Sequence, residues 1–225
     1  MIDEKKCEEL LRDGLTKMQI VVGDKKITLL IDYLSAFVKW NKAYNLSAIR
    51  DPLVMVEKHL LDSLVLVPHL EKTMKRSAEH SASKIKRMID VGTGGGLPGI
   101  PLAIIFPEID MVLLDSNGKK TRFLFQVKTQ LSLNNVFIEN TRVESYQPSV
   151  LFNIVVSRAF ASLYDMVKGT RHLLQPDGRL WAMKGLYPEN ELRECEKHAI
   201  VDAFYPLTVP NVGGERHLLV LNPIA

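Results

Sequence analysis

The feature that most constrains the fold is a glycine-rich segment, Asp90-Val91-Gly92-Thr93-Gly94-Gly95-Gly96-Leu97-Pro98-Gly99. A short run that contains Met88 and Ile89 precedes it, and a mostly apolar stretch, 97–106, follows it. This order predicts a strand, a glycine turn and a helix. Such a turn lets a ligand lie against bare backbone, and the N–H groups at the start of the helix point toward that ligand.

The charge beside the glycines narrows the class of ligand. Gly94, Gly96 and Gly99 satisfy the dinucleotide pattern G-x-G-x-x-G by spacing alone. However, the carboxylate of Asp90 comes just before the first glycine, where it would oppose a pyrophosphate and suit a cationic group. S-adenosylmethionine (SAM) carries an ammonium and a sulfonium and no phosphate, so the pattern favours SAM. The alternative is a plain tight turn whose carboxylate binds the N–H groups of its own loop.

A second acidic residue ends the next apolar run. Asp115 follows residues 111–114, where it would accept hydrogen bonds from ribose hydroxyls. NAD and SAM share that ribose, so Asp115 indicates a nucleoside without identifying it. The alternative for Asp115 is the N-cap of the following helix, and both roles can hold at once.

Composition limits the class of protein. The 225 residues are enough for one large domain, or for a domain with an appendage. The two cysteines, Cys7 and Cys195, lack metal-binding spacing, so we expect no metal site and a reduced, cytoplasmic protein. We find neither a signal-peptide core nor an apolar run as long as a membrane span. The net charge of +3 does not demand a nucleic-acid partner, although clustered basic residues could form a local patch.

The chain changes character near residue 85. Before it, apolar residues such as Ile27, Leu30 and Leu34 recur at helical spacing. After it, short apolar runs alternate with amphipathic segments. We therefore divide the chain into an N-terminal helical extension (1–70), a polar linker (71–85), expected to be mobile, and a SAM-binding domain (86–225).

The second part predicts an α/β fold. The expected strands are 86–91, 111–115, 136–140, 152–157, 178–184, 203–209 and 216–222, and the expected helices are 97–106, 117–132, 162–173 and 188–198. This alternation predicts a mostly parallel sheet with helices on both faces. The turn at 210–214 predicts that the last two strands form an antiparallel hairpin. Seven strands that end in such a hairpin are typical of the Rossmann-like fold of SAM-dependent methyltransferases.

Further motifs flank the glycine segment. They are Trp40-Asn41-Lys42-Ala43-Tyr44-Asn45-Leu46, Ile49-Arg50-Asp51-Pro52, His59-Leu60-Leu61-Asp62-Ser63, Leu114-Asp115-Ser116, Arg142-Val143-Glu144, Ser157-Arg158-Ala159-Phe160, Met183-Lys184-Gly185 and Gly214-Glu215-Arg216-His217. In this order, over about residues 36–221, they resemble the bacterial ribosomal RNA small subunit methyltransferase G family, also called glucose-inhibited division protein B.

The resemblance implies a cytoplasmic enzyme that methylates N7 of one guanine in the 530 loop of 16S ribosomal RNA, with SAM as methyl donor. We expect the RNA to be within a small-subunit particle, and the enzyme to be a monomer without an obligate protein partner. Two alternatives remain: a methyltransferase for a small molecule or a protein, and a dinucleotide-binding protein without catalysis.

Candidate cofactor residues come from the motifs and from the glycine segment. By motif match, the resemblance implies contacts from Gly92, Leu97, Asp115, Val143, Glu144 and Arg158. From the chain itself we add Asp90 for the ammonium group, the backbone of Gly94 and Gly96 beside the methionine part, and Arg142 next to the expected adenine site. The alternative for Glu144 is a solvated loop carboxylate.

The expected chemistry needs no acid or base. Guanine N7 has an exposed lone pair and no proton, so catalysis consists of alignment. The candidate positioning residues are Asn45, His59, Asp62, Arg158 and Lys184.

Each positioning candidate has an alternative. His59 and Asp62 share a helix face, either as a wall over the methyl site or as an internal network. Arg158 would bind the SAM carboxylate or an RNA phosphate, or only form an ion pair within the protein. Lys184 would meet a phosphate or remain a surface charge. We expect Arg216 and His217, which open the last strand, to support the fold.

Overall fold

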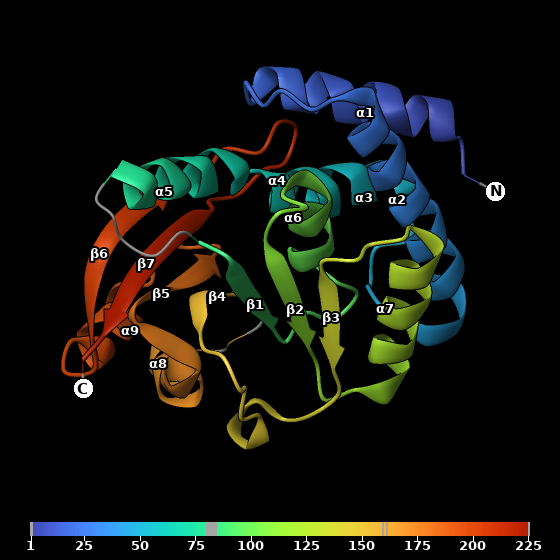
Figure 1. Cartoon of the computed structure of the whole chain (residues 1–225). Coiled ribbons are helices and arrows are strands. Elements are labelled where there is room, and N and C mark those ends of the chain that lie inside the picture. The colour runs from blue at the N-terminus through green and yellow to red at the C-terminus, as the bar shows by residue number, and fades with distance from the viewer. Residues whose placement is uncertain (1, 80–84, 159, 161, 225) are drawn as a thin grey trace.

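The computed structural model describes residues 2–79, 85–158, 160 and 162–224. Within them, seven strands form one sheet in the order β3-β2-β1-β4-β5-β7-β6 (Figure 1). The strands are β1 (Arg87–Val91), β2 (Asp110–Leu114), β3 (Val136–Glu139), β4 (Phe152–Ser157), β5 (Leu174–Lys184), β6 (Ala199–Pro206) and β7 (His217–Pro223). Only β7 runs antiparallel to its neighbours, β5 and β6, which confirms the predicted hairpin.

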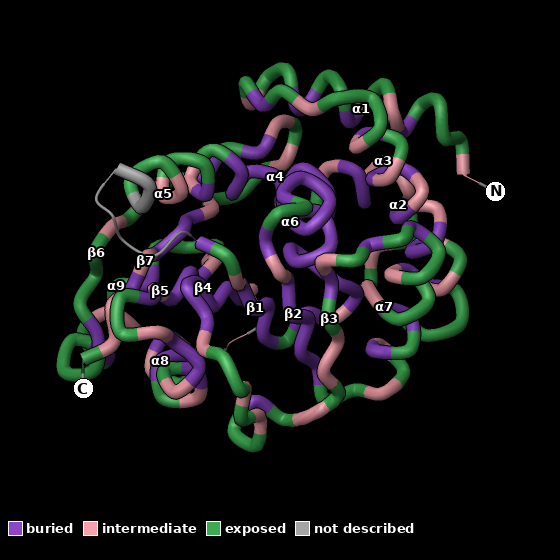
Figure 2. The backbone as a smooth tube through the Cα atoms, in the orientation of Figure 1, coloured by how far each residue is buried: buried purple, intermediate pink, exposed green. Residues whose placement is uncertain are grey.

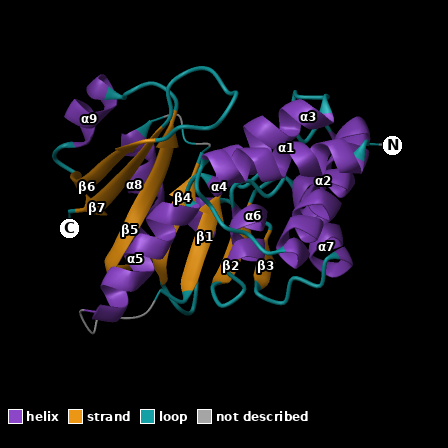
Figure 3. Cartoon of the chain, turned by 90° about the horizontal axis from the view of Figure 1, so that it is seen from above, coloured by secondary structure: helices purple, strands orange, loops and turns teal. Residues whose placement is uncertain are grey.

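Helices cover both faces of this sheet (Figures 1 and 3). The α-helices are α1 (Glu4–Lys17), α2 (Asp24–Tyr44), α3 (Pro52–Met55), α4 (Asp62–Leu64), α5 (Val67–Glu79), α6 (Gly99–Ile105), α7 (Gly118–Gln130), α8 (Leu163–Thr170) and α9 (Glu189–Cys195). A π-helical turn, η1 (Val56–Leu61), joins α3 to α4, and the 3₁₀ turns are η2 (Val143–Ser145) and η3 (Arg171–Leu173).

Two apolar layers hold the sheet because successive residues of a strand point to opposite faces. Met88 of β1 belongs to a buried cluster that includes residues of α2, α5, α6 and α7, whereas the next residue, Ile89, belongs to a second cluster that includes residues of α8 and α9. Figure 2 shows the central strands buried along most of their length. This burial on both faces explains why the strands are apolar runs without polar alternation.

The N-terminal helices belong to the first of these layers. The predicted stripe on α2 is confirmed, since Ile27, Leu30 and Leu34 are buried in one cluster with residues of the sheet. The helical segment therefore shares its hydrophobic core with the sheet.

The expectation of a polar linker at 71–85 is wrong for residues 71–79. They continue α5, in which Leu70 and Met74 recur at the spacing that begins with Leu66, just before the helix, and all three pack into the first layer. Polar composition cannot distinguish a linker from an amphipathic helix, because the exposed face of such a helix is polar as well. Residues 80–84 of the predicted linker lie outside the described residues.

The topology defines where a ligand can bind. The strand order reverses between β1, which continues to β2 and β3, and β4, which begins the other half of the sheet. Ligands of open α/β sheets bind at the carboxyl ends of the strands at such a point. The glycine segment follows β1 and Arg158 follows β4, so both lie there. In the described part of the chain, no helix is long and apolar enough to cross a membrane, and no cluster of side chains could hold a metal ion.

Candidate functional site

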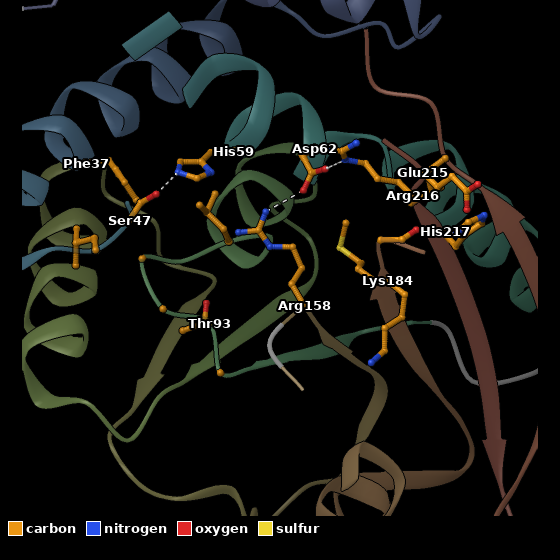
Figure 4. Close-up of a pocket in the computed structure, with 18 residues that line it drawn as sticks. Phe37, Ser47, His59, Asp62, Thr93, Arg158, Lys184, Glu215, Arg216 and His217 are labelled. Carbon is orange, nitrogen blue, oxygen red and sulfur yellow. Dashed lines mark hydrogen bonds and ion pairs between the residues drawn. The ribbon is translucent and has the colours of Figure 1, made fainter. Parts of the chain in front are cut away.

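Two adjoining pockets flank the glycine loop, residues 92–98. The arginine pocket, about 490 Å³, contains Arg158 and Arg216 and is drawn in Figure 4. The Asp115 pocket, about 360 Å³, contains Asp115 and Val143. Gly92 lines both pockets, so the loop forms the boundary between them.

Asp90 holds the glycine loop from beneath. Its Oδ2 accepts hydrogen bonds from the hydroxyl of Thr93 at 2.7 Å and from the backbone N–H of Gly99 at 2.8 Å. The residue is 0 % exposed, and Oδ1 has no hydrogen-bond partner among the described residues. Burial raises the pKa of Asp90 to about 6, although the two hydrogen bonds oppose this shift. Asp90 lines neither pocket, so the structure has the alternative arrangement: a carboxylate bound to its own loop.

Asp115 holds the same loop from the end of β2. Its Oδ2 accepts from the backbone N–H of Gly94 at 2.9 Å, and its Oδ1 accepts from Asn117 at 2.8 Å. The N-cap of α7 is Asn117, whose side chain accepts from the N–H of Lys119, so the alternative of Asp115 as N-cap is wrong. Asp115 lines the pocket that carries its name, where ribose hydroxyls could reach it.

A third contact to the loop comes from α2, and no local sequence pattern predicts it. The hydroxyl of Tyr33, a buried residue, donates a 2.7 Å hydrogen bond to the carbonyl of Gly95. The ring of Phe37, one turn further along α2, lies against Gly95, since a Cβ atom there would be only 2.3 Å from Phe37 Cε2. Three elements, β1, β2 and α2, thus fix consecutive residues of the loop.

The loop needs glycine for reasons of backbone and space. Gly92, Gly94 and Gly96 have φ values of 71°, 62° and 95°, which side chains rarely allow. Gly96 also packs against Ile100, 2.6 Å from where its Cβ would be. Gly92 and Gly94 line the arginine pocket together with Leu97, whereas Gly96 supports the loop from behind.

One carboxylate joins two arginines in the arginine pocket. Asp62 Oδ2 accepts from Arg158 Nη1 at 2.9 Å, and Asp62 Oδ1 accepts from Arg216 Nε at 2.5 Å (Figure 4). The expected ion pair of Arg158 is therefore present, and it lies in the wall of the pocket rather than away from it. The expectation for Arg216 was incomplete, since this residue also lines the pocket.

His59 lines the same wall in a neutral state. Its Nδ1 lies 3.0 Å from the carbonyl of Lys58, and its Nε2 lies 2.9 Å from the hydroxyl of Ser47. Because a carbonyl only accepts, Nδ1 carries the proton and Nε2 accepts from Ser47. Burial lowers the pKa of His59. The predicted shared face of His59 and Asp62 is confirmed, and it lies on and just after the π-helical turn.

The last two positioning candidates, Asn45 and Lys184, differ in whether they line a pocket. Asn45 is the exposed C-cap of α2, and its side chain accepts from Arg50. It is absent from the described lining of both pockets. Lys184, at the end of β5, lines the arginine pocket, and Glu191 pairs with its ammonium group at 2.8 Å. Figure 4 shows this group pointing away from Asp62.

The Asp115 pocket brings together most of the remaining cofactor candidates. Arg142, Val143 and Glu144, from the segment after β3, line this pocket together with Asp115 and Phe160. The structure thus gathers one predicted set in this pocket and another in the arginine pocket. Ser47, Thr93 and Glu215 line the arginine pocket and were not singled out by sequence. Thr93 and Glu215 had a signal, because Thr93 is in the glycine-rich segment and Glu215 is in the motif that opens β7.

Comparisons with solved structures agree with this fold. The chain is similar to the glycopeptide N-methyltransferase MtfA complexed with SAM (TM-score 0.53, 10% identity, 66% of this chain and 92% of that chain). It is also similar to TrmN from Thermus thermophilus (TM-score 0.55, 15% identity, 75% of this chain and 53% of that chain). The sheet order and the glycine loop at the strand reversal define the Rossmann-like fold that these methyltransferase structures share.

The sequence comparisons identify the family. The family model described as rRNA small subunit methyltransferase G matches residues 26–219. The chain is 53% identical to "Ribosomal RNA small subunit methyltransferase G" of Cellvibrio japonicus over 213 residues, 95% of this chain and 94% of the relative. It is 46% identical to the protein of the same name from Pseudomonas syringae pv. syringae over 225 residues, 100% of this chain and 99% of the relative. The chain belongs to this family, as its motifs predicted.

Proposed function

We propose that this enzyme transfers a methyl group from SAM to N7 of one guanine in the 530 loop of 16S ribosomal RNA. The relatives are named as ribosomal RNA small subunit methyltransferases, which supports an RNA substrate. We further infer that the RNA is methylated within a small-subunit particle, in the cytoplasm, and by a monomer.

The observation that carries this proposal is the junction of the two pockets at Gly92. The Asp115 pocket offers a carboxylate for ribose hydroxyls, with Val143 for an adenine face. SAM, when bound, supplies an electrophilic methyl group on a sulfonium. The bare backbone of Gly92 and Gly94 lets the methionine part of such a ligand pass from one pocket toward the other.

The arginine pocket suits a nucleophile that needs no base. Its ionisable groups are largely engaged: Asp62 by two arginines, His59 by a carbonyl and a hydroxyl, His217 by the carbonyl of Gly185, and Lys184 by Glu191. Glu215 is exposed at the outer rim. A group that must lose a proton would need one of these side chains released, whereas guanine N7 attacks with a lone pair that is already available. The task of the pocket is then to hold the guanine in line with the methyl group.

Methyl transfer to defined RNA substrates tests this proposal. Small subunits and free 16S rRNA are prepared from cells that lack the gene, incubated with labelled SAM, and the methylated base is mapped. We expect label at a single guanine N7 in the 530 loop, with more transfer to the particle than to free RNA. Label at another base or at a protein, or no label while S-adenosylhomocysteine still binds, would reject the substrate. Sedimentation of the enzyme tests the monomer.

A further inference from the structure

Asp62 lies between Arg158 and Arg216, each bound to a different carboxylate oxygen (Figure 4). We propose that Arg216 binds a phosphodiester group of the RNA substrate, and that Asp62 positions Arg216 together with Arg158. This inference rests on the proposed function, because it assigns part of the substrate to one side of the arginine pocket.

The guanidinium of Arg216 is held in one orientation. Its Nε donates to Asp62, and its Nη1 donates to the carbonyls of Gly213 at 3.1 Å and Gly214 at 3.2 Å. The side chain is 20% exposed, so the group is anchored and still reaches solvent. An arginine fixed in this way has already lost the rotamer freedom that binding would otherwise remove. It is therefore prepared to bind an anion.

The charges of the cluster favour an anionic ligand. Two guanidinium groups share one carboxylate, so the cluster of Asp62, Arg158 and Arg216 carries one excess positive charge, whereas Glu215, the other acidic residue in the described lining of the pocket, is exposed to solvent. Lys184, the other cation of the wall, is already paired with Glu191. Because Nε and Nη1 of Arg216 already donate to acceptors within the protein, Nη2 is the group that would donate to the phosphate. Asp62 thus keeps two like charges together that would otherwise repel each other.

The positions of the strands assign different anions to the two arginines. Arg158 follows β4, which pairs with β1 directly, so this arginine starts beside the glycine loop. Arg216 precedes β7, three strands away from β1 in the order β1-β4-β5-β7, so its backbone starts about 14 Å from β1 at the usual strand spacing, and its side chain reaches Asp62 from the side opposite to Arg158. The proposed reaction brings two anions here, the carboxylate of SAM and the RNA backbone. We therefore assign the carboxylate of SAM, beside the loop, to Arg158, and the RNA backbone, at the outer side, to Arg216.

Three variants test this assignment, with S-adenosylhomocysteine affinity by calorimetry and particle kinetics as separate measurements. For Arg216→Gln we expect S-adenosylhomocysteine affinity within twofold of the wild type and a KM for small-subunit particles at least tenfold higher. The slope of log kcat/KM against log salt should fall by about one, as for the loss of one phosphate contact. Asp62→Asn should weaken both cofactor and particle binding at least fivefold. Arg193→Gln, on the outside of α9 with a 69% exposed side chain, is the matched control and should change neither.

The outcomes separate the inference from the proposed function. An unchanged particle KM for Arg216→Gln, or a loss of S-adenosylhomocysteine affinity alone, would overturn the assignment. Thermal unfolding shows whether each variant is folded. If Arg216→Gln does not fold, Arg216→Lys tests the assignment instead. Lysine keeps the positive charge but lacks the guanidinium group. The salt slope of this variant should therefore stay near that of the wild type, while its KM for particles rises. A wild-type enzyme that methylates no particle would instead reject the proposed function.

Discussion

The hydroxyl of Tyr33 donates a hydrogen bond to the carbonyl of Gly95, although 62 positions separate the two residues in the sequence. Tyr33 is on α2, in the N-terminal helical segment, and Gly95 is in the middle of the glycine loop. The helical segment is therefore part of the support of the cofactor loop. Removal of the Tyr33 hydroxyl from α2 should therefore change the affinity for the cofactor.

We expect Tyr33→Phe to weaken S-adenosylhomocysteine binding by about tenfold, because the buried carbonyl of Gly95 loses its partner at a cost of about 1–3 kcal/mol. The melting temperature should fall by only a few degrees, at about 2–4 °C per kcal/mol for a chain of this size. Calorimetric titration and thermal unfolding measure the two effects. Tyr164→Phe on α8, outside the lining of both pockets, is the control. Equal affinity in wild type and Tyr33→Phe would show that the loop holds its shape without this bond.

Gly95→Ala should distort the loop through the ring of Phe37. The new Cβ would be 2.3 Å from Phe37 Cε2, so the ring or the loop must move, at a cost of about 1–3 kcal/mol. We expect weaker S-adenosylhomocysteine binding and a lower melting temperature. The double variant with Phe37→Leu should recover part of both. Gly23→Ala, where nothing lies within 4 Å of the new Cβ, is the control for affinity; because Gly23 is the N-cap of α2, its melting temperature should fall slightly. A double variant as impaired as Gly95→Ala would exclude Phe37 as the cause.

Asp90 should make the unliganded protein less stable as the pH rises from about 4 to 6. Burial raises its pKa in the folded state from 3.8 to about 6, so in this window the folded protein binds the additional proton. The stability that the protonated Asp90 contributes is fully present below its ordinary pKa of 3.8, and it is lost as the pH rises through the folded-state pKa of about 6. At about 1.4 kcal/mol per pH unit, the loss approaches 3 kcal/mol.

Urea unfolding of the wild type and of Asp90→Asn between pH 4 and pH 7 measures this loss. The free-energy difference between the two should fall with rising pH. Asp177→Asn, which removes an exposed carboxylate, should show no such trend. Parallel curves for the wild type and Asp90→Asn would mean that Asp90 is charged throughout.

Asp115→Ala should lower S-adenosylhomocysteine affinity by about 10–100-fold, since it removes the bond to Gly94 N–H and the proposed ribose contacts, each about 1–3 kcal/mol. The loss should be smaller for adenine alone, which has no ribose. An equal loss for both ligands would indicate that Asp115 acts only through the loop. Glu139→Ala at the end of β3, outside the lining of both pockets, is the matched control.

Much of the fold could be predicted because local patterns follow the sheet. The strand predicted at 152–157 has the same bounds as β4, and the turn residues before β7 correctly predicted the hairpin. The prediction of a linker was wrong at α5, because the exposed side of this helix is polar. Composition shows how polar a segment is, whereas the spacing of Leu66, Leu70 and Met74 shows that one side of it is buried.

The site was predictable where residues follow strands. Asp115, Val143 and Arg158 follow β2, β3 and β4, and the carboxyl ends of parallel strands meet at one edge. The contacts of Tyr33 with Gly95 and of Asp62 with Arg216 join segments far apart in the sequence, so no local pattern could reveal them. Asp90 shows a different limit: its charge suggested a ligand, whereas the structure uses that charge within the loop.

The position of β7 bears on how the chain becomes an enzyme during synthesis. This strand is made last of the seven, yet it lies between β5 and β6 and connects the two. Until residues 217–223 have left the ribosome, β6 has no neighbour in the sheet and Arg216 has no fixed strand to hold it beside Asp62. The glycine loop and Asp115 can be assembled earlier, from the first half of the chain. A nascent chain therefore acquires parts of the proposed cofactor pocket before the proposed substrate pocket is complete.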